Sequence, residues 1–498
     1  MTSSPAPAEN PKPGGVSERG RWQAYWVCVG VAALTILDLS KVNVGLPSIE
    51  ESLGAGPTEL QLIVAGYALA FGLALVPAGR LGDIRSRRLM FVIGLSLFTL
   101  ASLACALAPS VEVLVVSRIL QGVAAGIQMP QVLGLIQQLF EPKERGRAFG
   151  LFGATIGIST AFGPTLGGLL IAVGGPTDGW RLLFWMNIPL GLLALIFAIR
   201  LLPHTQRRDA AAMQLDPVGI VLLGMAVFSL MLPFLLTTGG PDDDPRRWFW
   251  LVGFAAATAA FIAWERHYSA LGKSPVLHFA LFARGSYRNG ILLATAYFGA
   301  IPAIFLLTTL YLQQGLDIEP VFAGMVSIPF ALASAVSAYI SGRLVDRHGR
   351  KLVVLGLVIV IAGFALVLLL GILTPPEYTL VAMAGGMFVA GVGGGMVVSP
   401  NQTLTLAEVP VTQGGVAGSM AQVGQRVGTA MGVAVATSTF YATLYSERGG
   451  RELAVYHDGF RNGFLVALAL ISVALLVGLF DLRARRRARR RAPAPQPA

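Results

Sequence analysis

The chain has 498 residues, of which 54% are hydrophobic and only 13% charged, and its mean hydropathy is +0.68. Soluble globular proteins usually carry about 25% charged residues, so a soluble fold is excluded and much of the chain must lie in lipid. The formal net charge of +11 would suit nucleic-acid binding, but seven arginines fall in one run, Arg483–Arg491, directly after the last apolar segment. Such a cluster holds that end in the cytoplasm and attracts anionic lipid. We therefore expect a lipid bilayer and no nucleic acid as partner.

The polar and reactive residues give no sign of an enzyme. Cys28 and Cys105 lie in apolar runs and are expected to be buried thiols. The five histidines show no metal-ligand spacing, and the segment LGKSP at 271–275 lacks the first glycine of a phosphate-binding loop. We expect no metal, no cofactor and no catalytic site, so the driving force should be an ion gradient.

Fourteen apolar segments follow one another along the chain. A membrane helix needs about 20 mostly apolar residues, and on that measure the spans centre near residues 34, 69, 97, 123, 159, 191, 226, 257, 299, 332, 360, 390, 426 and 470. The segments near 257 and 426 are the weakest. Basic residues follow the even-numbered spans 2, 4, 6, 8 and 10, whereas the loops after spans 12 and 13 fit less well. The positive-inside rule then places both termini in the cytoplasm.

Two charged decapeptides repeat within this pattern. GRLGDIRSRR begins at Gly79, after the second span, and GRLVDRHGRK begins at Gly342, after the tenth. Eight helices with short loops account for their separation. We expect a cytoplasmic tail at 1–21, a six-helix bundle at 22–205, two inserted helices at 206–280, a second six-helix bundle at 281–481 and a basic tail at 482–498. Internal repetition of this kind is characteristic of secondary transporters.

The repeated loop resembles the motif Gly-x-Leu-x-Asp-Arg-x-Gly-Arg-Lys/Arg of the major facilitator superfamily. The second copy is complete, with Gly342, Leu344, Asp346, Arg347, Gly349, Arg350 and Lys351; the first keeps Gly79, Leu81, Asp83, Arg87 and Arg88 but has Ile84 and Ser86 in place of an arginine and a glycine. The resemblance covers nearly the whole chain and points to the fourteen-helix drug:proton antiporter branch. It implies an all-α integral membrane fold of two six-helix bundles around a central cavity, with two helices inserted between them.

The loop motif has a physical interpretation beyond positive charge. Its glycine lets neighbouring helices approach closely, and its aspartate can pair with arginines and with a helix N-terminus. We interpret the two copies as paired cytoplasmic gates that latch the two bundles together in one state. Topology control by charge alone would explain basic loops, but not the repeated Gly-x-Leu-x-Asp. Since the first copy is usually the stricter one, we expect its gating contacts to be altered here.

The fourth span carries an arginine in an apolar helix. LVVSRILQGVAAG at 114–126 resembles the family's helix 4 motif with its Arg-x-x-Gln-Gly core. Arg118 is costly within a bilayer and should face a cavity or an acid, with Gln121 and Gln128 on the same side of the helix. The alternative is an Arg118 that snorkels to the interface.

The first span carries an acid and a base. LDLSKVNVGLP at 37–47 resembles the signature of the drug-exporting branch, matched at Asp38, Asn43, Leu46 and Pro47, whereas Lys41 departs from it. Asp38 and Lys41 share a helix face and can pair. Asp38 could carry the coupling proton in competition with Arg118, Lys41 or substrate, and Lys41 makes a neutral or acidic substrate more plausible than usual. A structural Asp38–Lys41 pair without a transport role stays open.

Two further helices complete the resemblance. GLFGATIGISTAFGPTLGG at 150–168 looks like the helix 5 motif of the antiporters, which implies export. Its small residues should pack against neighbouring helices and its proline should kink the helix; they are Gly153, Gly157, Gly163, Pro164, Gly167 and Gly168. In QVGQRVGTAMG, Arg426 falls inside the thirteenth span and is expected to line the cavity.

The function implied is proton-coupled export of drugs or antibiotics, with an amphipathic small molecule as substrate and a monomer in the bacterial cytoplasmic membrane. One alternative is a narrow-specificity exporter of a cellular metabolite. Another is a membrane sensor that has kept the fold and lost transport; the intact coupling motifs and the lack of a sizeable soluble domain weigh against it.

Overall fold

The computed structural model describes residues 17–175, 177–203, 216–237, 244–273, 275–277, 279–410, 413–446 and 453–491. Fourteen helical segments of these residues are long and apolar enough to cross a membrane, and each contains one of the fourteen predicted centres. The weaker predictions near 257 and 426 are therefore confirmed with the rest. Of the two expected tails, residues 1–16 and 492–498 lie outside the described residues, and the remainder of each belongs almost wholly to the first or last helix.

The first group of helices forms one bundle around a shared apolar core. Proline and polar caps define several starts: Ser17 accepts a hydrogen bond from the backbone of Gly20 before the first helix, and Glu141 and Glu144 form a capping box before the fifth. The elements are α1 (Glu18–Leu53), α2 (Pro57–Ile84), α3 (Arg87–Ala106), α4 (Val111–Leu139), α5 (Pro142–Gly174), α6 (Gly179–Trp185) and α7 (Asn187–Leu201).

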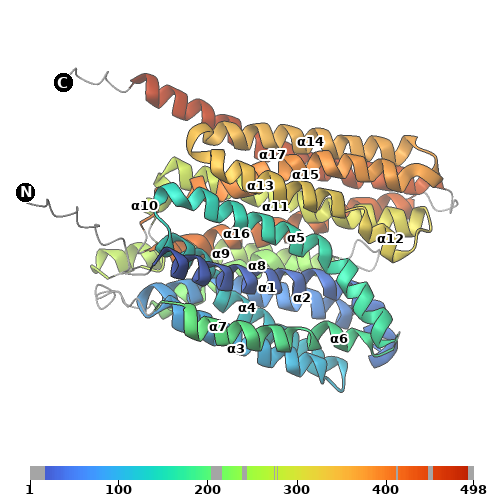
Figure 1. The fold of residues 1–498 in the computed structure, drawn as a ribbon, viewed down its shortest axis with the longest axis horizontal. Helices are drawn as coiled ribbons and strands as arrows, with labels where there is room; N and C mark the ends of the chain where they lie inside the picture. The colour runs from blue at the N-terminus through green and yellow to red at the C-terminus, as the bar shows by residue number, and fades with distance from the viewer. Residues whose placement is uncertain are drawn as a thin grey trace, which may run out of the picture.

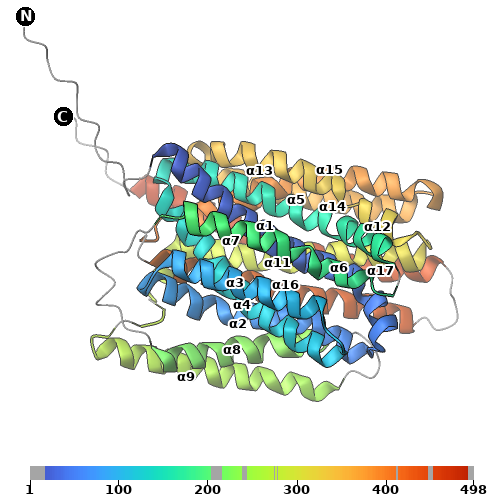
Figure 2. The ribbon, with the colours of Figure 1, turned by 60° about the horizontal axis from the view of Figure 1, so that its bottom comes forward.

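A separate helical pair follows this bundle in the chain. It consists of α8 (Pro217–Leu235), the short η2 (Pro245–Phe249) and α9 (Trp250–Ala270). The helices α8 and α9 pack on each other, and α8 also contacts α2 and α16 (Gly414–Ser446). Figure 2 shows the pair along one edge of the molecule, next to α2.

The last group forms the second bundle, with an apolar core of its own. Its elements are α10 (Ala280–Ala283), α11 (Gly285–Leu310), η3 (Tyr311–Gly315), α12 (Pro320–Met325), α13 (Ile328–His348), α14 (Arg350–Leu373), α15 (Pro376–Leu406), α16, and α17 (Leu453–Arg491). Two bundles with an inserted pair are the fold class expected from the sequence, which is thereby confirmed. The exact domain boundaries stay a prediction.

The two bundles meet mainly along α5 with α13 and α2 with α16. In Figure 1 the start of α1 and the end of α17 lie at the same end of the molecule. We call this the gate end: it is where α1 begins and α17 finishes, and where α2 and α13 end with the two charged decapeptides. The gate end and the middle of α1 and α4 hold the buried charges described next.

Candidate transport site and gate

A buried ionic cluster joins α1, α4 and α7 in the first bundle. The Asp38 carboxylate accepts a hydrogen bond from Arg118 Nη1 at 2.9 Å and one from Asn187 Nδ2 at 2.7 Å. Lys41 Nζ lies 3.5 Å from the same carboxylate and donates to Asn187 Oδ1 at 2.6 Å. The Asp38, Lys41 and Asn187 side chains are completely buried. One carboxylate thus holds two cations and an amide, with every strong polar group paired.

Arg118 is held by contacts within the protein and does not extend to the membrane–water interface. Its side chain is 1% exposed, and its guanidinium lies over the Tyr67 ring at 4.1 Å. Nε donates to the carbonyl of Ile63 at 3.3 Å, and Nη1 also donates to Gln121 Oε1. The arginine therefore faces an acid, as one of the two sequence interpretations expects, and the snorkelling alternative does not describe this arrangement.

Polar side chains on α3 and α4 extend the cluster. Gln121 Nε2 donates to Ser102 Oγ at 2.8 Å, and the same oxygen receives a bond from Asn187 at 3.2 Å. Gln128 lies apart from this group and donates to Thr35 Oγ1 at 2.7 Å. It is buried like Arg118 and Gln121 but does not share their hydrogen bonds. Asn43 is exposed on α1 and does not join the cluster.

Several members were not recognisable from the sequence. Ser102 and Tyr67 are ordinary residues of apolar helices, and nothing in their spacing marks them. Asn187 gave the one usable signal, because it stands as the single amide in the apolar run FWMNIPLGLLALIFAIR. A buried polar side chain needs a partner, so a lone amide at that position indicates a buried polar contact, without identifying Asp38 as the partner.

The glycine-rich motif of α5 serves two different contacts. A Cβ at Gly167 would lie 2.9 Å from the Lys41 carbonyl oxygen, and one at Gly163 would collide with the Ser40 side chain. These two glycines let α1 approach α5 at the ionic cluster. Gly153 and Gly157 face the second bundle instead. A Cβ built on Gly153 would lie 3.5 Å from Ser399 Cβ, and one built on Gly157 would lie 3.8 Å from Ser334 Oγ.

The far end of the same motif also faces the second bundle. Pro164 lies inside α5, and its Cβ is 3.8 Å from a Cβ built on Gly324 of α12. A Cβ on Gly168 would touch Val321 at 4.0 Å. The motif therefore sets the distance of α5 both to α1 and to α12 and α13. Its role as an antiporter signature stays a prediction.

Arg426 of α16 reaches across to the first bundle. Its guanidinium lies 4.4 Å from the centre of the Phe71 ring, and its side chain is half-buried. Phe71 and Tyr67 are neighbours on α2, with ring centres 6.0 Å apart. The two rings thus stand in a row between Arg118 of the first bundle and Arg426 of the second.

The first decapeptide joins the two bundles at the gate end. The Asp83 side chain is fully buried and accepts hydrogen bonds from the backbone N–H groups of Gly415 at 3.2 Å and Val416 at 3.1 Å. These are the first amides of α16, where an anion is stabilised by the helix dipole. Arg87 pairs with Asp83 at 2.7 Å. A Cβ at Gly79 would lie 2.8 Å from the Gly415 carbonyl oxygen.

These contacts differ from two sequence expectations. The first copy, despite Ile84 and Ser86, makes the aspartate-to-helix contact in full. Arg88, in contrast, takes no part in it: it donates to the backbone carbonyl of Ile199 in α7, within its own bundle. Arg88 therefore links α3 to α7 rather than α2 to α16.

The second decapeptide is not an equivalent latch in this structure. Gly342 and Val345 lie at the bundle boundary: a Cβ on Gly342 would clash with Gly146 and lie 2.8 Å from Gly150 Cα, and Val345 Cγ1 lies 2.8 Å from a Cβ built on Gly146. Arg350 is buried within the second bundle and pairs with Asp481 of α17 at 2.6 Å and with Asn401 of α15. The remaining charged side chains of the motif are exposed, namely Asp346, Arg347 and Lys351.

The reason for this asymmetry lies in the opposing helices. Asp83 faces α16, whose first turn carries no acidic residue. By symmetry Asp346 would face the start of α5, but that start is already capped by Glu141 and Glu144. A third carboxylate there would meet like charge rather than free amides.

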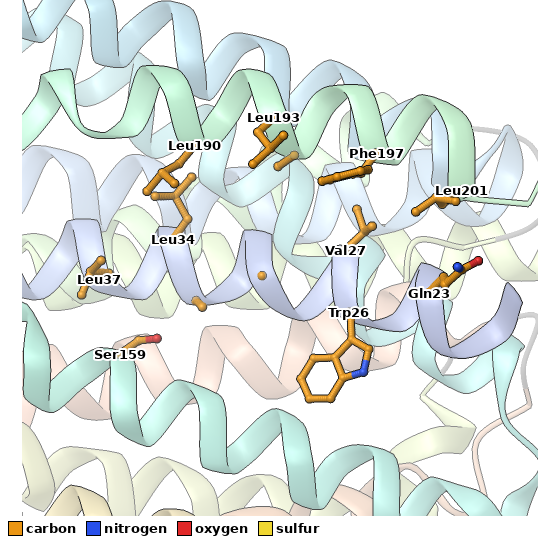
Figure 3. A pocket seen from close by; sticks show the side chains of 13 residues that line it. Gln23, Trp26, Val27, Leu34, Leu37, Ser159, Leu190, Leu193, Phe197 and Leu201 are labelled. Carbon is orange, nitrogen blue, oxygen red and sulfur yellow. The ribbon is translucent and has the colours of Figure 1, made fainter. Parts of the chain in front are cut away.

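Two other features lie near these sites. Beside the gate, Asp216 and Glu265 of the inserted pair are buried, and Arg80 of α2 interacts electrostatically with both. A groove of about 580 Å³ also runs along α1 between α5 and α7. Figure 3 shows its apolar lining, with Trp26 pointing toward α5. It carries no charged residue and follows a different face of α1 from the ionic cluster.

The fold and the buried charges in mid-helix define a multi-pass membrane transporter. The family model described as Major Facilitator Superfamily matches residues 28–433 and 290–497, and the chain belongs to this family. It is a transporter and not an enzyme.

Three relatives and one solved structure illustrate the similarity. The chain is 33% identical over 89% of its length to the probable actinorhodin transporter of Streptomyces coelicolor, covering 77% of that protein. It is 34% identical over 92% to the puromycin resistance protein pur8 of Streptomyces alboniger, covering 90% of it. It is 26% identical over 92% to the riboflavin transporter RibZ of Clostridioides difficile, covering 96%. The human organic anion transporter MFSD10 (TETRAN) superposes with a TM-score of 0.65 at 14% identity, over 92% of this chain and 99% of that one; at this identity the likeness shows the fold alone.

Proposed function

We propose that this chain is a proton-coupled antiporter that exports antibiotics or drugs across the bacterial cytoplasmic membrane. It works as a monomer with both termini in the cytoplasm. The observation that carries the proposal is the fully buried Asp38 carboxylate, shared between Arg118 and Lys41. An ionisable side chain within a membrane helix is a functional-site hypothesis by default.

The cluster offers a simple way to couple a proton to movement. A proton on Asp38 removes the negative charge that holds Arg118 and Lys41, and two buried cations without a counter-ion are unstable. The cations must then move, or a substrate group must replace the carboxylate as their partner. Competition for one site between a proton and a substrate is the condition for exchange.

The contacts at the gate end are the second part of the proposed transport mechanism. In this structure Asp83 holds α16 against α2, and Gly342 allows α13 to lie against α5. Alternating access requires both contacts to separate as one bundle rocks against the other. Because these two contacts are made at the gate end, they hold that end closed in this structure.

The substrate class is supported by the relatives. Two of them are named for an antibiotic, as a transporter of actinorhodin and as a resistance protein against puromycin. Export, rather than uptake, agrees with the antiporter-like glycine motif of α5.

The test uses inverted membrane vesicles with an acidified interior. Actinorhodin, puromycin and cationic dyes are added in turn, and dissipation of the pH gradient is followed for the wild type, Asp38→Asn and the exposed-site control Asp346→Asn. The proposal expects proton release with at least one compound, retained in the control and abolished in Asp38→Asn. Release that persists in Asp38→Asn would place the proton elsewhere.

A second candidate is a narrow-specificity exporter of a cellular metabolite, favoured by the similarity to a riboflavin transporter. The same vesicles separate the two. Competition among chemically unrelated antibiotics supports a drug exporter, whereas release with riboflavin alone supports the metabolite exporter.

A further inference from the structure

The middle of the membrane-spanning helices carries an excess of positive charge. Among the described residues, five ionisable Asp, Glu, Lys or Arg side chains lie more than six positions from both ends of a candidate span: Asp38, Lys41, Arg118, Arg426 and Arg461. Arg461 is exposed on α17 and pairs with Asp458 at 2.8 Å. The other four comprise three cations and one carboxylate. This region therefore holds two positive charges without a protein counter-ion.

Arg426 is the cation left without an acid. Asp38 already pairs with Arg118 and Lys41. Over the part of the chain that the structure describes, the contact of the Arg426 guanidinium is the face of Phe71 at 4.4 Å, and no ion pair to it is present. A guanidinium has five N–H donors that match a carboxylate in a planar fork. Stacked on one face and half-buried, it is held in place with those donors still available.

A second polar group near Arg426 also lacks a partner. The Tyr67 hydroxyl is completely buried and makes no hydrogen bond to any residue that the structure describes, although buried hydroxyls are nearly always paired. It lies within electrostatic range of Asp38 and of both Arg118 and Arg426. An unpaired donor near the Arg426 guanidinium suits a negatively charged oxygen supplied from outside the protein.

We propose that the exported substrate is an aromatic anion, whose carboxylate or enolate oxygen binds the Arg426 guanidinium and the Tyr67 hydroxyl while its ring packs against Phe71. This assignment rests on the proposed function and names the substrate class of the same site. The anion removes part of the excess positive charge, so the loaded site is less costly to bury than the empty one. The contact also spans the two bundles, because Arg426 belongs to α16 and the aromatic residues to α2.

The test compares three naphthalene probes that differ in charge: 2-naphthoate, 2-naphthamide and 2-naphthylmethylammonium. Their binding to the purified transporter in lipid nanodiscs is measured by equilibrium dialysis. A charge-assisted pair with a guanidinium predicts that naphthoate binds at least about tenfold tighter than naphthamide. The ammonium probe should bind most weakly.

The variants assign the preference to residues. Arg426→Gln should abolish the discrimination between naphthoate and naphthamide, Arg426→Lys should keep part of it, and Tyr67→Phe should weaken naphthoate several-fold. The matched control is Arg343→Gln, because Arg343 is also stacked on an aromatic ring, Tyr339 at 4.9 Å, but lies near the gate end of α13. It should bind all three probes as the wild type does. A thermal unfolding curve for each variant shows that it is folded.

Any one of three results would overturn the inference. The ammonium probe could bind as tightly as naphthoate, Arg426→Gln could retain the preference for naphthoate over naphthamide, or no probe could bind at millimolar concentration. The result is independent of the coupling proposal. A preference that depends on Arg426 stands even if the vesicle assay shows no antiport, and antiport of cations alone would leave the function standing while the substrate class fails.

Discussion

Asp83→Asn tests how strongly the gate holds the two bundles together. The carboxylate accepts two backbone hydrogen bonds from α16, at 3.2 and 3.1 Å, and pairs with Arg87. Asparagine keeps one neutral acceptor, so one bond to a charged group, worth about 1.5–3 kcal/mol, is lost and the other is weakened by about 1 kcal/mol. The closed gate should lose roughly 2.5–4 kcal/mol. Since 1.4 kcal/mol is tenfold, this shifts the closed–open equilibrium by about 60- to 700-fold.

Double electron–electron resonance measures that shift directly. Spin labels are attached at Arg85→Cys and His348→Cys, two exposed positions at the gate end of different bundles. The native cysteines are completely buried, so they should not be labelled. Asp83→Asn should move population from the short to the long label distance. The matched control is Asp346→Asn, which alters the equivalent but exposed aspartate and should leave the distances unchanged. An unchanged distribution in Asp83→Asn would refute the latch.

Two further substitutions test the ionic cluster and its packing. Gly167→Ala places a Cβ 2.9 Å from the Lys41 carbonyl oxygen and should lower the unfolding free energy by about 1–3 kcal/mol through overpacking; Gly153→Ala, with 3.5 Å to its nearest neighbour, should not. Thermal unfolding followed with a thiol-reactive dye measures the stability of both glycine variants. An equal loss of unfolding free energy in the two would contradict the close approach of α1 and α5. Arg118→Gln removes the charged hydrogen bond to the buried Asp38 carboxylate, which keeps Lys41 as a partner, and should cost about 1.5–3 kcal/mol. The double variant Asp38→Asn/Arg118→Gln should be less destabilised than the sum of the two single variants, and strict additivity would contradict the pairing.

The membrane fold could be predicted from the sequence because lipid imposes one simple requirement on composition. Each apolar segment of about 20 residues must be a helix. A helix long enough to cross the membrane is present at all fourteen expected positions. The pairing of Asp38 with Lys41 was accessible for a similar reason, since residues three apart share a helix face. The acid facing Arg118 followed from the cost of an unpaired charge in lipid.

The partners brought together by tertiary packing could not be predicted. Asn187 lies 149 positions from Asp38 in the chain, and no local pattern links them. The motif residues of the two decapeptides also do not reveal that one aspartate is buried and the other exposed. That difference depends on the opposing helix: the start of α5 supplies its own carboxylates, whereas the start of α16 has none. A motif thus specifies what a residue can bind, while packing decides whether the partner is present.

The central claim is that Asp38 carries the coupling proton, and transport measured in two modes tests it most directly. Reconstituted wild type and Asp38→Asn are loaded with the compound that gives the largest proton release. Accumulation driven by a pH gradient is then compared with exchange of labelled for unlabelled compound without a gradient. The account predicts that Asp38→Asn loses gradient-driven accumulation but still exchanges substrate. Undiminished accumulation in Asp38→Asn, at the wild-type proton dependence, would contradict it.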